Sequence, residues 1–510
     1  MGDEGGKVYL VGAGPGAADL VTLRAAELVR TAHVIVYDHL ANQDLLSTVA
    51  ATTELIRAVG GSGTMARDEL VRTLVEKARS GKSVVRLFDG DPFFADSAAN
   101  EASALAAAGI DFELVPGLSL ASAAPSFAGI PLACSDHVSP VTFVNLDREA
   151  ASSAKFSSWK ELADITRGGG TLVLSIGTDS MRESLERLIA SGMPPDSPAC
   201  AIFDATMAAQ KVVAATVTTL SAEVERSRLN ATAIIVIGDR AAVQPQLRWF
   251  ERRPLFGRRI VVTRGSANAA ALTAPLRAHG AEVIECPTIE TGPPDSYAAL
   301  DAALGNLGSF DWVIFTSATG VDNFFTRMAA RGGDIRELAS ARIAAIGPAT
   351  AARLKSHALK IAVQPSEYRA EAIAHAIGES RIRGARFLIP RAQVARETLP
   401  EMLATQGAAT VEVVPCYKTV MPKGVRVERL RGLVDAGAID LVTFTSSSTA
   451  TNFCAIVGAV PPALKAGAIG PITAETARTL GFEVVVSPSE YTIDSLVGAI
   501  VEYFAAKRKN

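Results

Sequence analysis

The sequence predicts an α/β protein of several domains, and three observations support this prediction. Short segments rich in β-branched residues alternate with Ala- and Leu-rich helical stretches along most of the chain. A series of motifs in the C-terminal half occurs twice in the same order, at an offset of about 125 residues. The chain has 510 residues, which is too long for one ordinary domain and indicates about three or four.

The composition excludes several classes of protein. Hydrophobic residues make up 48% of the chain and charged residues 20%, which is typical of a globular protein with a large core. A net charge of −3 argues against nucleic-acid binding, because nucleic-acid-binding proteins carry an excess of Lys and Arg. No apolar run approaches the roughly 20 residues that span a bilayer, and the acidic start does not resemble a signal peptide. We therefore expect a cytoplasmic protein with no membrane or nucleic-acid partner.

Metal chemistry is not expected from the cysteines and histidines. The five cysteines are scattered without a C-x-x-C pair, and the six histidines show no ligand spacing. The cysteines are interpreted as buried thiols in a reducing compartment, and no metal site is predicted.

Residues 1–245 are expected to form the first domain. Its apolar, β-branched segments predict strands at Val8–Gly12, Val34–Asp38, Val84–Phe88, Phe112–Pro116, Val141–Leu146, Thr171–Gly177 and Ala233–Gly238. Because helical stretches separate these segments, mostly parallel sheets are expected.

A change of composition marks a connector at residues 246–258. The stretch Leu247–Arg259 contains five arginines and three large aromatic residues. One interpretation is a solvated linker anchored by Trp249 and Phe250. The other is that some of these arginines reach toward an anionic ligand.

Residues 259–510 hold the duplication, which predicts two similar α/β lobes with a cleft between them. We place one lobe at approximately 259–290 plus 420–510 and the other at 291–419. The repeated pairs are Asp311–Phe324 with Asp440–Phe453, Ala344–Leu354 with Gly467–Leu480, Pro365–Tyr368 with Pro488–Tyr491, and Ile260–Arg264 with Phe387–Arg391.

Hydroxyl side chains gather where a strand hands over to a helix in each copy. The first copy reads Phe-Thr-Ser-Ala-Thr at 315–319, and the second reads Phe-Thr-Ser-Ser-Ser-Thr at 444–449. Open parallel sheets bind ligands at the carboxyl ends of their strands, where helix N-termini present unpaired N–H groups. These hydroxyls would therefore either contact a ligand or cap the following helix, and both interpretations stay open.

The ordered motifs VVTRG, DWVIFTSATGV, AAIGPATA, PCYKTV, DLVTFTSSST and AIGPITAETA resemble uroporphyrinogen-III synthase across residues 257–510. The resemblance implies two flavodoxin-like α/β lobes. It also implies an enzyme that needs no metal or cofactor and closes the linear tetrapyrrole hydroxymethylbilane while inverting its last pyrrole ring.

The same resemblance implies roles for individual residues. Tyr417 matches the tyrosine of the family and would be the weak acid that assists loss of the substrate hydroxyl as water, although a core role for its ring stays open. Arg264 and its repeat equivalent Arg391 would bind substrate carboxylates. Further hydroxyl or N–H donors toward the substrate would be Thr316, Ser317, Thr445, Ser446, Ser447 and Thr476.

A second set of motifs in the N-terminal half resembles uroporphyrinogen-III C-methyltransferase, over roughly Val8–Gly238. These motifs are VYLVGAGPGAADLVTLRAAELV, VIVYDHL, GKSVVRLFDGDPFF, AGIDFELVPGLSLASAAPSFAGIPL and AIIVIG. The resemblance implies a two-lobed fold that binds S-adenosylmethionine and forms a homodimer, with Asp38 as proton acceptor. The cofactor contacts that it implies are Pro15, Asp89, Gly90, Asp91, Phe94, Ser119, Leu120, Ile176 and Ala205.

This half departs from the family pattern at the expected substrate site. VGKR has become VGGSG at Val59–Gly63, RLKGGDPFIFGRGGEE has become RLFDGDPFFADSAANE, THRD has become ACSD at Ala133–Asp136, and the VTGH histidine has become Asp147. Basic groups are lost and acidic ones appear in a site meant for eight carboxylates. Each lost charge-assisted hydrogen bond would remove about 1.5–3 kcal/mol, so impaired methylation of uroporphyrinogen is expected.

Three functions follow for the whole chain. The first is a uroporphyrinogen-III synthase fused to a methyltransferase-like half with impaired uroporphyrinogen methylation. The second is a bifunctional enzyme that proceeds to precorrin-2, and the third is a two-lobed tetrapyrrole-binding module without catalytic activity.

Overall fold

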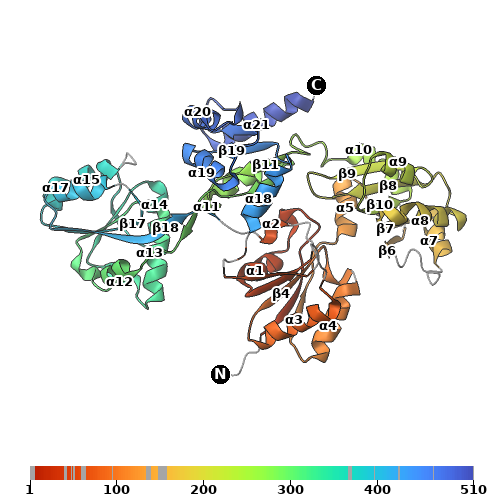
Figure 1. Ribbon diagram of the computed structural model, residues 1–510, viewed down its shortest axis with the longest axis horizontal. Coiled ribbons are helices and arrows are strands. Elements are labelled where there is room, and N and C mark those ends of the chain that lie inside the picture. Colours follow the sequence, from red (N-terminus) through yellow and green to blue (C-terminus); the bar gives the residue numbers. More distant parts are fainter. Residues whose placement is uncertain are drawn as a thin grey trace. The chain divides into compact units, whose positions relative to one another are not determined.

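The computed structural model describes residues 6–38, 43–46, 49, 52–58, 65–94, 96–133, 139–146, 158–365, 370–395, 397–422, 425–462 and 464–508. The chain divides into two compact units (Figure 1). One consists of Met1–Cys286 together with Lys423–Asn510, and the other is Pro287–Pro422. Their described residues form four sheets, two in the N-terminal half and two in the duplicated half.

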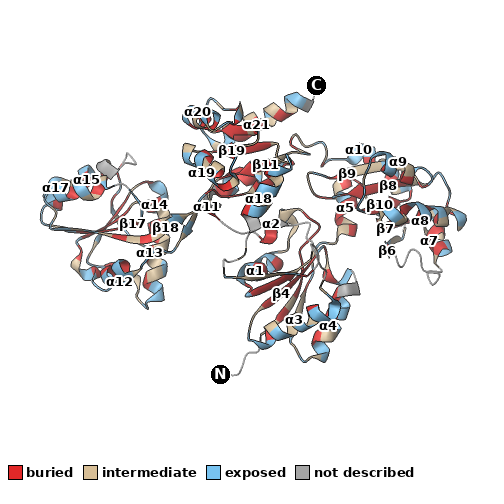
Figure 2. Cartoon of the chain, viewed as in Figure 1, coloured by how far each residue is buried: buried red, intermediate tan, exposed pale blue. Residues whose placement is uncertain are grey.

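The first sheet is parallel throughout, in the order β3-β2-β4-β1-β5. Its strands are β1 (Val8–Gly12), β2 (Val34–Tyr37), β3 (Glu54–Arg57), β4 (Val84–Phe88) and β5 (Phe112–Val115), and its main helices are α1 (Leu23–Thr31), α3 (Arg67–Arg79) and α4 (Asp96–Ala107). Successive residues of β2 enter two different apolar clusters, because the sheet is covered on both faces (Figure 2). This explains the nearly continuous apolar runs of the sequence.

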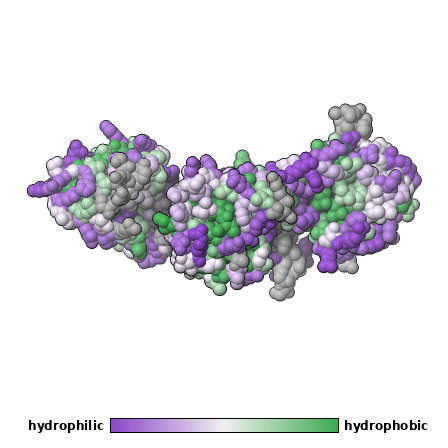
Figure 3. Space-filling view, turned by 90° about the horizontal axis from the view of Figure 1, so that it is seen from above, coloured by the Kyte–Doolittle hydropathy of each residue, from purple (hydrophilic) through white to green (hydrophobic). Residues whose placement is uncertain are grey.

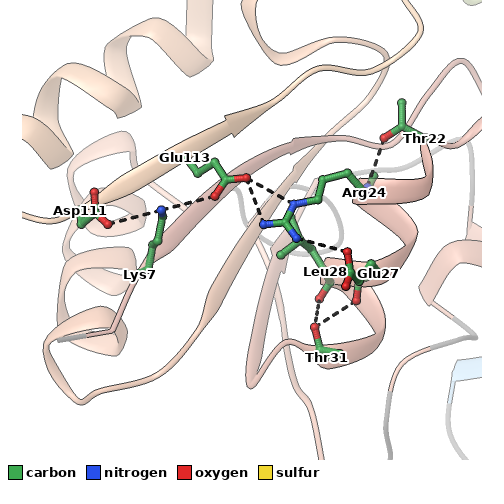
Figure 4. Close-up of polar contacts among 9 residues, drawn as sticks. Lys7, Thr22, Arg24, Glu27, Leu28, Thr31, Asp111 and Glu113 are labelled. Atoms are coloured by element: carbon green, nitrogen blue, oxygen red, sulfur yellow. Dashed lines mark hydrogen bonds and ion pairs between the residues drawn. The ribbon is translucent and has the colours of Figure 1, made fainter. Parts of the chain in front are cut away.

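Ion pairs fasten α1 to the edge of this sheet. Glu113 on β5 forms ion pairs with Arg24 at 3.2 Å and with Lys7 at 3.4 Å (Figure 4). Arg24 also forms an ion pair with Glu27, and Lys7 forms one with Asp111. These side chains are partly exposed, so the network orients α1 more than it stabilises the fold.

The second sheet has the order β6-β7-β10-β8-β9, and only β6 and β7 pair in parallel. Its strands are β6 (Val141–Leu146), β7 (Thr171–Gly177), β8 (Pro198–Phe203), β9 (Lys211–Thr216) and β10 (Thr232–Ile237). The expectation of mostly parallel sheets is wrong here, because β10 pairs antiparallel with both β7 and β8, and β8 and β9, which were not predicted, also pair antiparallel. Residues 204–210 between them are too few for a parallel crossover, so the two strands pair antiparallel.

The linker packs on α5 (Leu120–Ala128), the helix that lies against the second sheet. Phe250 is buried, and Trp249 Nε1 donates a hydrogen bond to the Ser126 carbonyl at 2.9 Å. Both rings also contact Phe127, at centroid distances of 5.3 and 4.8 Å. The aromatic anchoring predicted from the sequence is confirmed.

Two of the connector arginines are engaged in structural ion pairs. Arg258 pairs with Asp440 and Arg259 pairs with Glu282, each at 2.9 Å. These pairs hold the start of the duplicated half to its own sheet.

The duplicated half contains two lobes with the same strand order. The split lobe has the sheet β12-β11-β19-β20-β21, with β11 (Arg259–Val262), β12 (Glu282–Glu285), β19 (Leu441–Phe444), β20 (Lys465–Ala468) and β21 (Glu483–Val486). The inserted lobe has β13-β18-β17-β14-β15-β16, with β13 (Glu290–Gly292), β14 (Trp312–Phe315), β15 (Arg342–Ala345), β16 (Ile361–Val363), β17 (Arg386–Ala392) and β18 (Thr410–Val420).

When the strands are numbered by their place in the repeated sequence, both parallel sheets run 2-1-3-4-5, which is the flavodoxin-like order. Each lobe takes strands 1 and 2 from one copy and strands 3 to 5 from the other. The inserted lobe adds β13 antiparallel to the end of β18. The prediction of two flavodoxin-like lobes is therefore confirmed.

Three of the cysteines in the part of the chain that the structure describes are buried, as the sequence predicted. Cys200, Cys286 and Cys416 are buried, and Cys454 is half-buried. Burial raises the pKa of the Cys200 and Cys416 thiols to about 12, so both are unreactive at neutral pH. Within the same described ranges, no cluster of three or more His, Cys, Asp or Glu side chains could hold a metal.

Figure 3 shows hydrophilic residues over most of the face in view, with smaller hydrophobic areas between them. Among the described residues, no helix has the length and apolar composition of a membrane span.

Candidate active sites

The N-terminal half contains a cavity of about 210 Å³ at the carboxyl ends of its strands. The first lobe contributes Gly14, Pro15, Asp89, Gly90, Asp91, Phe94, Ser119, Leu120 and Ala121, and the second contributes Phe143, Val144, Asn145, Val173, Ser175 and Ile234. Seven of the nine cofactor contacts implied by the resemblance lie in this lining. Ile176 and Ala205 do not, because both side chains are buried in core clusters.

Glycines let three strand ends approach each other beneath this cavity. Gly14 and Gly90 have φ of 77° and 66° and bond to each other through N–O distances of 2.9 and 3.3 Å. A Cβ added at Gly117 would lie 2.0 Å from the carbonyl oxygen of Gly90, so no side chain fits there. The loops that follow β1, β4 and β5 are thereby held together.

Asp91 ties two of these loops to each other. Its Oδ1 accepts a hydrogen bond from the Phe93 amide at 2.9 Å, and its Oδ2 accepts one from the Gly117 amide at 3.0 Å. Ser119 caps α5 by accepting from the Ala121 amide at 3.2 Å, which aims the first turn of that helix at the cavity. An anion or a polar ligand group would find N–H donors there.

The sequence interpretation missed the residues of the second lobe that line the cavity. Phe143 and Asn145 stand two apart on β6, and Val173 and Ser175 two apart on β7, so each pair shares one face of the sheet. Phe143 meets Phe94 edge to face, with ring centroids 5.6 Å apart. The two-residue spacing could be seen in the sequence. Which face of the sheet meets the first lobe could not be predicted from it.

Asp38, the implied proton acceptor, is held by a buried arginine. Arg86, which is 2% exposed, donates to Asp38 Oδ2 at 2.7 Å and to Glu101 Oε2 at 3.0 Å. Burial alone would lower the pKa of Arg86, but the two carboxylates outweigh it and keep that pKa raised. Arg86 therefore stays charged and fixes the Asp38 carboxylate, which does not line the cavity.

Most of the positions that depart from the family pattern lie outside the described residues. This applies to Val59–Gly63, residues 134–136 and Asp147, and to the side chain of Asp96. Asp89 is described, and it is exposed at the cavity wall.

In the inserted lobe, Tyr417 and Ser317 come together although 100 residues separate them. Ser317 caps α13 (Ala318–Ala330) by accepting from the Gly320 amide at 3.0 Å, and its Oγ lies 3.1 Å from the Tyr417 hydroxyl. Both residues are half-buried, and the Tyr417 ring packs partly against the lobe core. A phenol is thus positioned at the N-terminus of a helix, where negative charge is stabilised.

The other candidates of the inserted lobe are placed differently. Arg391 is 7% exposed and forms an ion pair with Glu397, so its charge is matched within the lobe. Thr316 is half-buried immediately after β14. Beside them, Asp295 accepts from Lys418, and this hydrogen bond lowers the pKa of Asp295 below its ordinary value.

The split lobe carries the equivalent candidates. Arg264 follows β11 and is half-buried, and no hydrogen-bond or ion-pair partner for it occurs among the described residues. Thr445 is likewise half-buried after β19. Ser446 caps α19 (Ser447–Val457) in a capping box with Thr449.

Ser447 contacts the neighbouring helix of the split lobe. Its Oγ lies 2.9 Å from Thr476 Oγ1 on α20 (Pro471–Thr479). Helix capping therefore accounts for Ser446, while the hydroxyls of Ser447 and Thr476 join two helices. The predicted ligand contacts of these residues stay predictions.

The candidate residues of each lobe gather where its strand order reverses. In a 2-1-3-4-5 sheet this point lies between the first and third strands, and ligands bind outside their carboxyl ends. Arg264 and Thr445 follow β11 and β19 in the split lobe, and Arg391 and Thr316 occupy the equivalent places in the inserted lobe. Each lobe thus presents a cation and hydroxyls at its switch point.

Comparison with known families matches both halves. The family described as Uroporphyrinogen-III synthase HemD matches residues 270–498, and the family Tetrapyrrole (Corrin/Porphyrin) Methylases matches residues 7–221. The chain is 33% identical over 505 residues to the Porphyrin biosynthesis protein HemD of Ruminiclostridium josui, and the alignment covers 98% of each chain.

Two further relatives carry methyltransferase names. A Uroporphyrinogen-III C-methyltransferase of Bacillus subtilis (strain 168) is 31% identical over 84% of this chain and 87% of its own. An S-adenosyl-L-methionine-dependent uroporphyrinogen III methyltransferase of Methanosarcina barkeri is 39% identical over 47% of this chain and 93% of its own. Among solved structures, a uroporphyrin-III-C-methyltransferase from Thermus thermophilus is 29% identical over 48% of this chain and 96% of its own, with a TM-score of 0.39.

Proposed function

Since this chain belongs to the family that joins a tetrapyrrole methylase domain to a uroporphyrinogen-III synthase domain, we propose that its C-terminal half closes hydroxymethylbilane with inversion of ring D. The observation that carries this proposal is the Tyr417 phenol held 3.1 Å from Ser317 at the start of α13. A weak acid at the ligand-binding end of the sheet can assist the loss of water that begins this cyclisation.

Binding would depend on the charge of the substrate. Hydroxymethylbilane carries eight carboxylates, which fit arginine side chains and the N-termini of helices. In the split lobe Arg264 follows β11 and has no hydrogen-bond or ion-pair partner among the described residues, and α19 follows the neighbouring strand β19. In the inserted lobe α13 offers the amides of its first turn.

The chemical step would use Tyr417 as general acid. Its O–H gives a proton to the hydroxymethyl oxygen, and the C–O bond breaks with its electron pair on the oxygen. The departure of water generates an electrophilic azafulvene. The Ser317 hydroxyl can donate to the phenolate, and the N-terminus of α13 stabilises its charge. Closure with inversion forms a C–C bond between the electrophilic carbon and the α-carbon of ring D that already carries the bridge to the neighbouring ring. That bridge bond then breaks, the released bridge carbon bonds to the other α-carbon of ring D, and the proton lost from that carbon restores the phenol. Positioning of the last ring decides which isomer forms.

For the N-terminal half, we propose that the cavity binds S-adenosylmethionine and that uroporphyrinogen methylation is impaired. The apolar walls and the N–H donors at α5 fit a nucleoside, and the exposed carboxylate of Asp89 fits a cationic sulfonium. The cofactor, when bound, supplies a methyl group. Asp89 and the lost basic positions oppose a substrate with eight carboxylates.

A second candidate function is a bifunctional enzyme that also methylates its own product to precorrin-2. The 39% identity to the M. barkeri methyltransferase over 93% of that relative favours it. Asp38, fixed by Arg86, would then be the proton acceptor.

One incubation separates these functions. The full chain is mixed with hydroxymethylbilane, with and without S-adenosylmethionine, and the oxidised porphyrins are resolved by isomer and mass. We expect type III porphyrin in both mixtures and no added methyl mass. Methylated product that requires the cofactor would establish the bifunctional enzyme, and type I porphyrin alone would overturn the synthase assignment.

A further inference from the structure

The loop between β8 and β9 reaches across the N-terminal half to the glycine-rich turn Gly14–Ala17. Thr206 in this loop accepts a hydrogen bond from the Ala17 amide at 3.0 Å, and its Oγ1 lies 3.4 Å from the carbonyl oxygen of Pro15. The partners are about 190 residues apart in the chain and belong to different lobes. A single hydroxyl therefore links the second lobe to both sides of the turn.

The backbone of this loop is held in an unfavourable conformation. Thr206 has φ of 70° and Asp204 has φ of 45°, which is uncommon for residues with a side chain and especially for a β-branched one. Such conformations persist when surrounding contacts require them, and they concentrate at functional sites. This backbone conformation of the β8–β9 loop sets the position of the Thr206 hydroxyl.

A buried glutamine supports the same loop. Gln210, which is 1% exposed, accepts from the Thr206 amide at 3.0 Å and donates to the Phe127 carbonyl at 3.3 Å. Phe127 lies in the last turn of α5, whose first turn lines the cavity. The loop is thus joined to two elements of the cofactor cavity, the glycine-rich turn and α5.

The fit between loop and turn leaves little room for a side chain at Gly16. A Cβ at Gly16 would lie 3.2 Å from Thr206 Oγ1 and 3.1 Å from Met207 Sδ. Gly14 and Pro15, on the other side of the turn, line the cavity. A shift of the turn would therefore move the cavity wall.

We propose that Thr206 is a positioning residue that sets the affinity of the cavity for its nucleoside cofactor by holding the glycine-rich turn in place. The proposal rests on the cofactor binding proposed above. Thr206 itself does not line the cavity, so it acts through Pro15 and Gly14.

The test uses the full chain and S-adenosylhomocysteine as the probe, with the dissociation constant measured by calorimetry. Thr206→Val keeps the branched shape without the hydroxyl, Thr206→Ala removes both, and Thr206→Ser keeps the hydroxyl. We expect binding about 10-fold weaker for the first two, the equivalent of one net hydrogen bond, and near wild type for Thr206→Ser. Ser184→Ala is the control, since it removes a buried hydroxyl of the same lobe without a hydrogen-bond partner among the described residues.

Hydrogen exchange of the Ala17 amide gives a readout that general destabilisation would not imitate. Exchange should accelerate in Thr206→Val and Thr206→Ala, but not in Thr206→Ser or Ser184→Ala, because only Thr206 accepts this amide. Equal affinity of wild type and the hydroxyl-free variants would overturn the positioning role alone. A folded wild-type chain that does not bind the probe would overturn the proposed cofactor binding together with it.

Discussion

In both lobes of the duplicated half, a serine follows the third strand of the sheet and caps the next helix. In the split lobe, Ser446 shares a capping box with Thr449, whose hydroxyl faces the Ser446 amide at 3.4 Å. In the inserted lobe, Gly320 stands where Thr449 would, and Tyr417 approaches Ser317 instead. A Cβ on Gly320 would lie 4.0 Å from the Tyr417 ring and 3.2 Å from Ser317 Oγ.

The strand register identifies the counterpart of Tyr417. Arg259 pairs with Glu282 in the split lobe, as Arg386 pairs with Thr410 in the inserted lobe. Counting the same number of residues onward places Ile289 where the other copy has Tyr417. Duplication therefore preserved the sheet and the helix cap, while one lobe combines the phenol, which lies in the second copy, with the space for it at Gly320, which lies in the first copy.

The largest expected effect follows from removing the phenol hydroxyl. Tyr417→Phe should lower kcat of porphyrinogen synthesis about 100-fold, because a general acid contributes at least that factor. Ile289→Val, at the equivalent position of the other copy, should leave kcat unchanged. Steady-state assays with hydroxymethylbilane check both variants, and equal activities would remove the functional distinction between the lobes.

The two equivalent arginines should differ in what they affect. Arg264→Ala should lower kcat/KM about 10- to 100-fold through KM, because a charge-assisted hydrogen bond to a substrate carboxylate is lost. Arg391→Ala should change KM less and lower the midpoint of thermal unfolding, because Arg391 is buried and paired with Glu397. Kinetics and a thermal scan of both variants decide this, and the reverse pattern would contradict the assignment.

The two capping serines provide a matched pair. Ser317→Ala and Ser446→Ala should each cost about 1 kcal/mol of stability through the lost cap. Only Ser317→Ala should also lower kcat, by about 10-fold, since only Ser317 contacts a phenol. Ser317→Thr keeps a hydroxyl and should recover kcat. A similar loss of kcat in both alanine variants would indicate a purely structural role.

The smallest effect concerns pH. The hydrogen bond from Lys418 lowers the pKa of Asp295, so its contribution to stability is present above about pH 4, the unfolded value, and is lost as pH falls through the lower folded value. Lys418→Met should remove this contribution, so wild type and variant should converge below pH 4. Unfolding transitions recorded across the acid range measure the convergence, and a constant difference would contradict it.

Local pattern was sufficient for much of the fold. The strands β1, β4, β6 and β7 begin and end at the residues that the apolar runs predicted, because each run is bounded by turn residues. The β8–β9 hairpin was missed, since β9 is a partly exposed edge strand whose pairing partner is not visible in its own composition. Ile176 and Ala205 have side chains buried in cores and lie outside the cavity lining, so their cofactor contacts stay predictions.

The order of the domains, the duplication and the residue types at each strand end could be predicted from the sequence, because they depend on periodicity and motif order. Which of those residues meet depends on how the strands and helices pack. Packing pairs Arg391 with Glu397, brings Ser317 to Tyr417 and joins Thr206 to the turn at Pro15. The partners in these contacts are separated by a few residues to about 190 residues in the sequence. A local pattern cannot predict such contacts, because they form only when the sheets and helices pack.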